Sequence, residues 1–141
     1  MTDYLVDNSV WARLSSGDGA IAERLRRVER APADLLVTCP PQVLEFCHSA
    51  RTPAEYARYY ERISLGFPLE NAPEESLVVG IQRSLWGLGL VRAAGAVDIL
   101  IAGYAIANDA TVLTADHDFD YIASVSELRY EYVAPSGPAE N

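Results

Sequence analysis

Three short apolar runs alternate with longer segments of helical periodicity, and this alternation constrains the fold more than any other feature. The runs cover Tyr4–Asp7, Leu35–Thr38 and Thr111–Thr114. Their apolar residues are consecutive instead of alternating with polar ones, which is typical of strands buried on both faces. The sequence therefore predicts an α/β fold, with a mostly parallel sheet covered by helices on both faces in three layers.

Capping residues, prolines and glycines divide the rest of the chain into helices. We expect helices over residues 8–16, 20–30, 40–50, 52–64, 73–90, 96–108 and 119–124, and short strands over 67–69 and 130–133. Asp18 is the predicted cap of the second helix and Asp118 that of the last. In parallel sheets ligands bind at the carboxyl ends of the strands, so functional side chains are expected there.

The 141 residues fit one domain. We expect residues 1–134 to form it and residues 135–141, with two prolines and a glycine, to be a flexible tail. No apolar run approaches the roughly 18 residues that cross a bilayer, and no signal peptide is visible, so we expect a cytoplasmic protein without membrane contact. Cys39 and Cys47 do not form a metal-binding or redox pair and are expected to be buried thiols.

The basic residues exclude several classes of enzyme. All 11 are arginines, so the chain has no lysine for a phosphate-binding loop, a kinase strand or a Schiff base. The net charge of −9 argues against a basic face that coats nucleic acid non-specifically. It is compatible with an enzyme that acts on nucleic acid through a bound metal ion.

Four acidic residues lie at or near the carboxyl ends of the predicted strands, where parallel sheets bind ligands. Asp7 ends the first strand, and Asp116 follows the strand at 111–114. Glu45 lies about one turn into the helix after the second strand, and Asp98 lies in the first turn of its helix. Each has a simpler interpretation. Asp7 is also suited to cap a helix, and Asp116 is also suited to a position in a turn. Glu45 shares a stripe with Gln42 and Ser49, which favours a solvated face.

Asp98 is the hardest of the four to explain structurally. It lies among Val97, Ile99 and Leu100, in a helix that is predicted to be buried. An unpaired buried carboxylate is costly and needs donors, a proton or a cation. Four carboxylates in one cleft would also repel one another. Without lysine, a divalent ion is the expected counter-charge, and oxygen ligands favour Mg²⁺ or Mn²⁺ over zinc.

The order of these motifs resembles the PIN domain, and within it the VapC-type toxin ribonucleases of bacterial type II toxin–antitoxin pairs. The resemblance rests on the segments Val6–Trp11, Val97–Ala102 and Leu113–Asp120, and on Glu45 by position. It covers essentially the whole chain. It implies a PIN-like fold and metal-dependent cleavage of single-stranded or looped RNA. Asp7, Glu45, Asp98 and Asp116 then carry over as the catalytic, metal-binding acids.

The resemblance also implies supporting residues. Ser9 and Thr114 match hydroxyl positions that orient carboxylates or water. Asp118 is either an auxiliary ligand or a helix cap, and the cap is favoured. Arg13, on the first helix, is placed to point towards the cleft. The expected chemistry is hydrolysis of a phosphodiester by metal-activated water, without a protein nucleophile.

Two histidines and a group of aromatic residues are weaker candidates. His48 has no second Glu-x-x-His motif to pair with, so a structural position is favoured. His117 is either an acid or phosphate contact, or a plain loop residue, and the loop is favoured because no group visibly orients it. The segment 51–62 interleaves arginines with Tyr56, Tyr59 and Tyr60, which suits an amphipathic helix or a partner-binding groove.

The resemblance implies two protein partners: a small antitoxin and a second copy of the chain, giving a homodimer. We expect a basic, partly disordered antitoxin segment to lie in the groove and to place an arginine or lysine among the four acids. Two alternatives remain: a catalytically silent PIN-like binding module, and an α/β phosphohydrolase or receiver-like domain. The second lacks its expected motifs, since the chain has no lysine and no Asp-x-Asp after the first strand.

Overall fold

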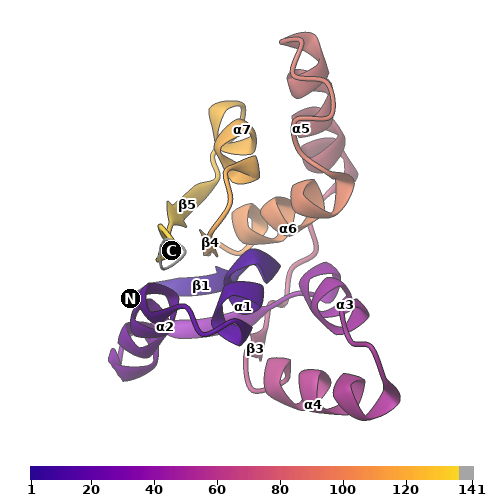
Figure 1. Ribbon diagram of the computed structural model, residues 1–141. Helices are drawn as coiled ribbons and strands as arrows, with labels where there is room; N and C mark the ends of the chain where they lie inside the picture. Colours follow the sequence, from indigo (N-terminus) through magenta and orange to yellow (C-terminus); the bar gives the residue numbers. More distant parts are fainter. Residues whose placement is uncertain (137–141) are drawn as a thin grey trace.

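The computed structural model describes residues 1–136 and contains a five-stranded sheet in which every neighbouring pair is parallel. The strand order is β3-β2-β1-β4-β5. The strands are β1 (Asp3–Val6), β2 (Leu35–Thr38), β3 (Phe67–Pro68), β4 (Thr111–Thr114) and β5 (Arg129–Tyr132). The predicted α/β fold with a parallel sheet is confirmed (Figure 1).

Seven helices in the described part of the chain connect the strands. They are α1 (Asn8–Ser15), α2 (Gly19–Arg30), α3 (Pro40–His48), α4 (Pro53–Ile63), α5 (Glu75–Gly87), α6 (Ala96–Ala107) and α7 (Asp118–Ser124). Every predicted helix and strand is present. The largest difference is in α5, which ends at Gly87, three residues before the predicted end.

Two hydrophobic clusters lie on opposite faces of the sheet. Leu5, Val37 and Val112 pack with α5, α6 and α7, whereas Val6 and Leu113 pack with α1, α2, α3 and α4. Adjacent residues of one strand therefore enter different cores, because side chains alternate between the faces of a sheet. This explains why the strands are apolar at consecutive positions.

The strand order creates a switch point between β1 and β4. The chain leaves β1 towards β2 and β3 on one side and returns to β4 on the other. At such a point the loops after the two strands diverge and leave room for a ligand. Asp7 N–H donates to the Leu113 carbonyl at 2.8 Å, which continues the pairing of the two strands up to this edge.

Helix ends agree in part with the predicted caps. Asp18 caps α2 by accepting a hydrogen bond from Ile21 N–H at 3.1 Å, as predicted. The Asp118 prediction is wrong, because α7 begins at Asp118 itself and His117 is its N-cap residue. The cap of α1 is Asp7, whose carboxylate accepts from Ser9 N–H at 3.3 Å.

The C-terminal residues, the two cysteines and the helix lengths can be compared with the remaining sequence predictions. Ser136 is hydrogen-bonded to the Asp18 carboxylate through its N–H, at 2.8 Å, and its hydroxyl, at 3.0 Å. The rest of the predicted tail, residues 137–141, lies outside the described residues. Cys39 and Cys47 are buried free thiols, and burial raises the pKa of Cys39 to about 11. None of the described helices combines the length and hydropathy needed to span a bilayer.

Candidate active site

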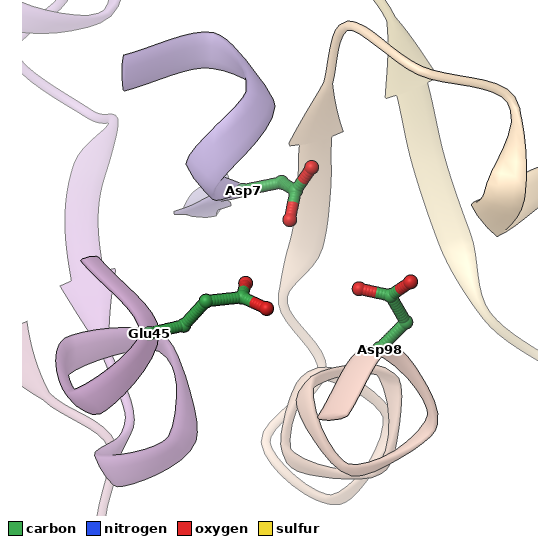
Figure 2. A group of neighbouring side chains, drawn as sticks. All are labelled: Asp7, Glu45 and Asp98. Carbon is green, nitrogen blue, oxygen red and sulfur yellow. The ribbon is translucent and has the colours of Figure 1, made fainter. Parts of the chain in front are cut away.

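Three carboxylates from separate parts of the chain meet at the carboxyl edge of the sheet. Asp7 follows β1, Glu45 lies on α3 and Asp98 lies in the first turn of α6. One carboxylate oxygen of each lies within 4.8 Å of those of the other two. Figure 2 shows the three side chains converging on a common space. The site predicted at this edge is therefore present as an acidic cluster.

Asp7 is the most rigidly held of the three. Its side chain is buried, and its Oδ2 accepts hydrogen bonds from the Ser9 hydroxyl at 2.6 Å and the Thr114 hydroxyl at 3.2 Å. Burial raises the pKa of Asp7, the Ser9 hydroxyl lowers it, and the charge of Asp116 raises it again. The net direction is upward, so the surroundings of Asp7 favour a proton or a cation.

Glu45 is positioned by a buried glutamine one turn earlier. Gln42 Nε2 donates to the Val6 carbonyl at 2.6 Å, and its Oε1 accepts from Cys39 N–H at 3.3 Å. These bonds fix the start of α3 against the end of β1. Since residues three apart share one side of a helix, Glu45 then faces Asp7. The solvated stripe favoured for Gln42 and Glu45 is thus wrong, because Gln42 is buried and Glu45 half-buried.

Asp98 carries the largest shift in pKa among the site acids. Burial, followed by the charges of Asp7 and Glu45, raises its pKa from 3.8 to about 7. The helix around it is less buried than its sequence predicts, since Val97 and Leu100 are 41% and 37% exposed. The pKa of Glu45 is also raised, by burial and then by Asp7 and Asp116. All three acids therefore repel one another's charge.

Asp116 lies beside the cluster and not within the group of three. Its Oδ1 accepts a hydrogen bond from Asp118 N–H at 2.8 Å, at the start of α7. Its charge nevertheless raises the pKa of Asp7, Glu45 and Asp98. Burial and then Asp116 raise the pKa of Asp118, and a hydrogen bond with Asp98 lowers it. Asp118 thus lies near Asp98 and Asp116, as the less favoured auxiliary-ligand alternative requires.

Ser9 and Thr114 occupy the supporting positions predicted for them. Besides contacting Asp7, the Ser9 hydroxyl accepts from Ala115 N–H at 2.9 Å and lies 3.3 Å from the Thr114 hydroxyl. Arg13 is exposed on α1 and forms no ion pair with a cluster acid among the described residues. No cation is among the causes of the shifts in pKa of Asp7, Glu45 or Asp98.

The two histidines lie on the surface. His48 is exposed at the end of α3. His117 is exposed too, but its Nδ1 lies 3.0 Å from Asp120 Oδ2, and its ring stacks on Tyr132. Sequence reasoning missed Asp120 as the group that orients His117. The spacing of three residues at a helix start was the available clue.

The three tyrosines of α4 line separate hollows instead of one groove. Tyr59 stacks on Phe46, with ring centroids 4.9 Å apart, and lines a hollow of about 610 Å³ with Trp11 and Arg62. Tyr56 and Tyr60 line two other hollows. A further cavity of about 430 Å³ also includes Trp11 and Arg62. The Trp11 indole N–H is buried and has no hydrogen-bond partner among the described residues.

The cluster has the properties of a site for a hard divalent cation. Its donors are carboxylate oxygens from rigid elements, as Mg²⁺ and Mn²⁺ prefer. Mutual repulsion and burial leave the charges without compensation from a described arginine. A divalent ion would supply that compensation, so the donor set fits the ion predicted from the sequence.

Comparison with known proteins identifies the family. A sequence model of the PIN domain matches residues 4–125. The chain therefore belongs to the PIN-domain family. Within that family it is similar to VapC ribonucleases, which confirms the resemblance seen in the sequence. Ribonuclease VapC11 of Mycobacterium tuberculosis is 30% identical, over 89% of this chain and 95% of the relative.

A second relative and two solved structures agree with this assignment. Ribonuclease VapC51 of Mycobacterium tuberculosis is 31% identical over 95% of both chains. VapBC-1 from nontypeable Haemophilus influenzae matches with a TM-score of 0.69 at 21% identity, over 93% of this chain and 98% of that one. VapBC2 from Rickettsia felis, bound to a promoter DNA fragment, matches over the same shares with a TM-score of 0.71 at 14% identity. At these identities the structures establish the shared fold.

Proposed function

We propose that this protein is an endoribonuclease that hydrolyses single-stranded or looped RNA with Mg²⁺ or Mn²⁺ and acts as the toxin of a toxin–antitoxin pair. The observation that carries the proposal is the convergence of Asp7, Glu45 and Asp98 within 4.8 Å without a described counter-charge. The ribonuclease names of the relatives support the choice of RNA as substrate.

Asp7, Glu45 and Asp98 would hold the ion, with Asp116 adding negative charge beside them. When bound, a divalent ion supplies positive charge that polarises the scissile phosphate and increases the acidity of water. Ser9 and Thr114 hold the Asp7 carboxylate in one orientation through the hydrogen bonds given above. A fixed carboxylate keeps the site ready for its ligand without rearrangement.

Glu45 is the residue best suited to accept a proton from the attacking water. Its carboxylate accepts no hydrogen bond from another described protein group, so its oxygens are free to orient water. In the metal-free protein, burial and the neighbouring acids raise its pKa. No protein nucleophile is needed, which agrees with the absence of lysine and of a reactive thiol at the cluster.

Cleavage of total cellular RNA by the purified protein tests this function. We expect Mg²⁺ or Mn²⁺ to be required and Asp7→Asn, Glu45→Gln, Asp98→Asn and Asp116→Asn each to lose most of the activity. Asp109→Asn, the same change at an exposed acid, is the matched control and should remain active. Full cleavage in excess chelator, or an active Asp98→Asn protein, would contradict the metal-site assignment. Folded but wholly inactive wild-type protein would favour the silent binding module.

The partner proposal rests on charge and on one face of the molecule. The names of the structural neighbours describe VapBC complexes of a toxin–antitoxin family. With its net charge of −9, this chain would attract a basic, partly disordered segment of an antitoxin. Such a segment fits the hollow beside Tyr59 and Trp11. An arginine or lysine further along it would reach the acids.

Growth experiments test the toxin role separately. Expression of this chain alone should arrest growth, and the product of the neighbouring small reading frame should restore it. The active toxin is proposed to be a homodimer, which light scattering of the purified protein checks. If expression is harmless while the purified protein cleaves RNA efficiently, a housekeeping nuclease becomes the better explanation.

A further inference from the structure

A stacked pair of aromatic rings lies next to the acidic cluster and has no part in the chemistry described so far. The imidazole of His117 and the ring of Tyr132 have centroids 4.2 Å apart and planes inclined by 19°. His117 comes from the start of α7 and Tyr132 from the end of β5. The pair thus joins two elements at the carboxyl edge of the sheet, seen side by side in Figure 1.

The strand register places this pair on the far side of β4 from Asp7. Tyr132 pairs with Thr114 of β4, and the Thr114 hydroxyl lies 3.2 Å from the Asp7 carboxylate. His117 lies between Asp116 and Asp118, two acids whose charges act on the cluster. Neighbouring strands are about 5 Å apart, so β5 lies about 10 Å from β1, the strand that Asp7 follows, with β4 between them.

The imidazole is held in place yet accessible. Its Nδ1 lies 3.0 Å from Asp120 Oδ2. Asp120 also accepts a hydrogen bond from the Tyr130 hydroxyl. This bond lowers the pKa of Asp120 more than the contact with His117 does. Tyr132 covers one face of the ring. The His117 side chain is still 66% exposed, which leaves its other face open to solvent. The ring is therefore a planar surface that is fixed on one side and open on the other.

We infer that His117 and Tyr132 form a stacking platform for the nucleobase beside the scissile phosphate, a binding subsite for single-stranded RNA. The inference rests on the proposed function. RNA bases have planar faces that stack on aromatic side chains whatever their sequence. Stacking also suits this protein electrostatically. A chain with a net charge of −9 and no lysine attracts phosphate groups weakly outside the metal site, so contacts to bases would add to substrate binding.

A scan with abasic RNA tests the platform. The probes are short single-stranded RNAs that carry one mapped cleavage site, each lacking the base of a single nucleotide near that site. We expect one position at which removal of the base raises the KM of the wild-type protein by about 5- to 150-fold, the range for one stacked base. His117→Ala should raise KM for intact RNA by a similar factor. It should have little further effect on the RNA that lacks that base.

Two further variants separate stacking from other roles of the histidine. His117→Phe keeps the ring without its nitrogens and should retain most of the wild-type KM, whereas an acid–base or phosphate contact would be lost. Tyr121→Ala removes an exposed aromatic residue of the same helix and should leave KM unchanged. Thermal unfolding should show that all variants fold, since His117 and Tyr121 are exposed.

The outcomes distinguish this inference from the function on which it rests. If cleavage is efficient and the KM is the same for every abasic RNA, the platform is overturned and the nuclease proposal remains intact. The platform is overturned in the same way if His117→Ala weakens cleavage equally for every abasic RNA, or if His117→Phe behaves like His117→Ala. If the folded wild-type protein cleaves none of the RNAs with either metal, the proposed function itself fails.

Discussion

Neutralising Asp98 should stabilise the metal-free protein. The pKa of Asp98 rises from 3.8 to about 7, first through burial and then through Asp7 and Glu45. At about 1.4 kcal/mol for each pKa unit, ionised Asp98 reduces the free energy of unfolding by about 4 kcal/mol. Solvent around this partly exposed side chain reduces the measurable effect to about 2 kcal/mol. Asp98→Asn removes the charge with little change in shape and should recover that amount.

The direction of the pH dependence follows from the raised pKa. Between about pH 4 and pH 7 the folded protein binds more protons at Asp98 than the unfolded chain does, so stability falls as the pH rises through this window. Asp7 and Glu45, whose pKa values are also raised, act in the same direction. The advantage of Asp98→Asn should thus be absent near pH 4 and complete near pH 8.

Thermal unfolding in chelator at several pH values measures this effect. At about 4 °C for each kcal/mol in a domain of this size, the variant should melt about 8 °C above the wild-type protein at pH 8. Asp109→Asn, at an exposed and left-handed position that asparagine tolerates, is the control and should change little. Parallel pH profiles for wild type and Asp98→Asn would refute the idea that the three carboxylates repel one another in the folded state.

Three other changes have definite expected outcomes. Mn²⁺ at a free concentration of a hundred times its Kd should stabilise the wild-type protein by about 2.7 kcal/mol, and calorimetry should show a smaller increase for Asp98→Asn. Ser9→Ala leaves the Ala115 N–H without its acceptor and should lower the free energy of unfolding in urea by about 1–3 kcal/mol, together with a slower cleavage rate. Gly103→Ala would place a methyl group 2.6 Å from Val78 Cγ1, where α5 packs on α6. We expect about 1–3 kcal/mol of destabilisation with unchanged metal affinity, measured by urea unfolding and calorimetry.

The pattern of apolar runs was sufficient to predict the strands and helices. Leu5 and Val6 show why: both are apolar because each faces a different core, and only a sheet covered on both sides demands this. The pattern could not predict the order of β1, β2 and β4, because these three strands are similarly apolar. Nor did it give the exposure of Val97 and Leu100, since apolar residues also occur at surfaces that flank a site.

The acids were found from their positions, but their roles were not. Asp7 was ambiguous between helix cap and site residue, and the structure gives it both roles at once. Asp118 follows the pattern of a cap, yet α7 begins at Asp118 itself, and the Asp118 N–H donates to the Asp116 carboxylate. Gln42 was overlooked because its hydrogen bonds reach a strand 36 residues away, and such long-range contacts leave no local pattern.

The distribution of the acids along the chain has a consequence for protein synthesis. Asp7 emerges from the ribosome early. Asp98 and β4, the strand that pairs with β1, are synthesised much later. Contacts between such distant segments form only after both have been synthesised, and they form late in folding. A chain that terminates before residue 98 thus lacks one of the three acids of the cluster. The acidic site can therefore assemble only after Asp98 has been synthesised, well after Asp7 and Glu45.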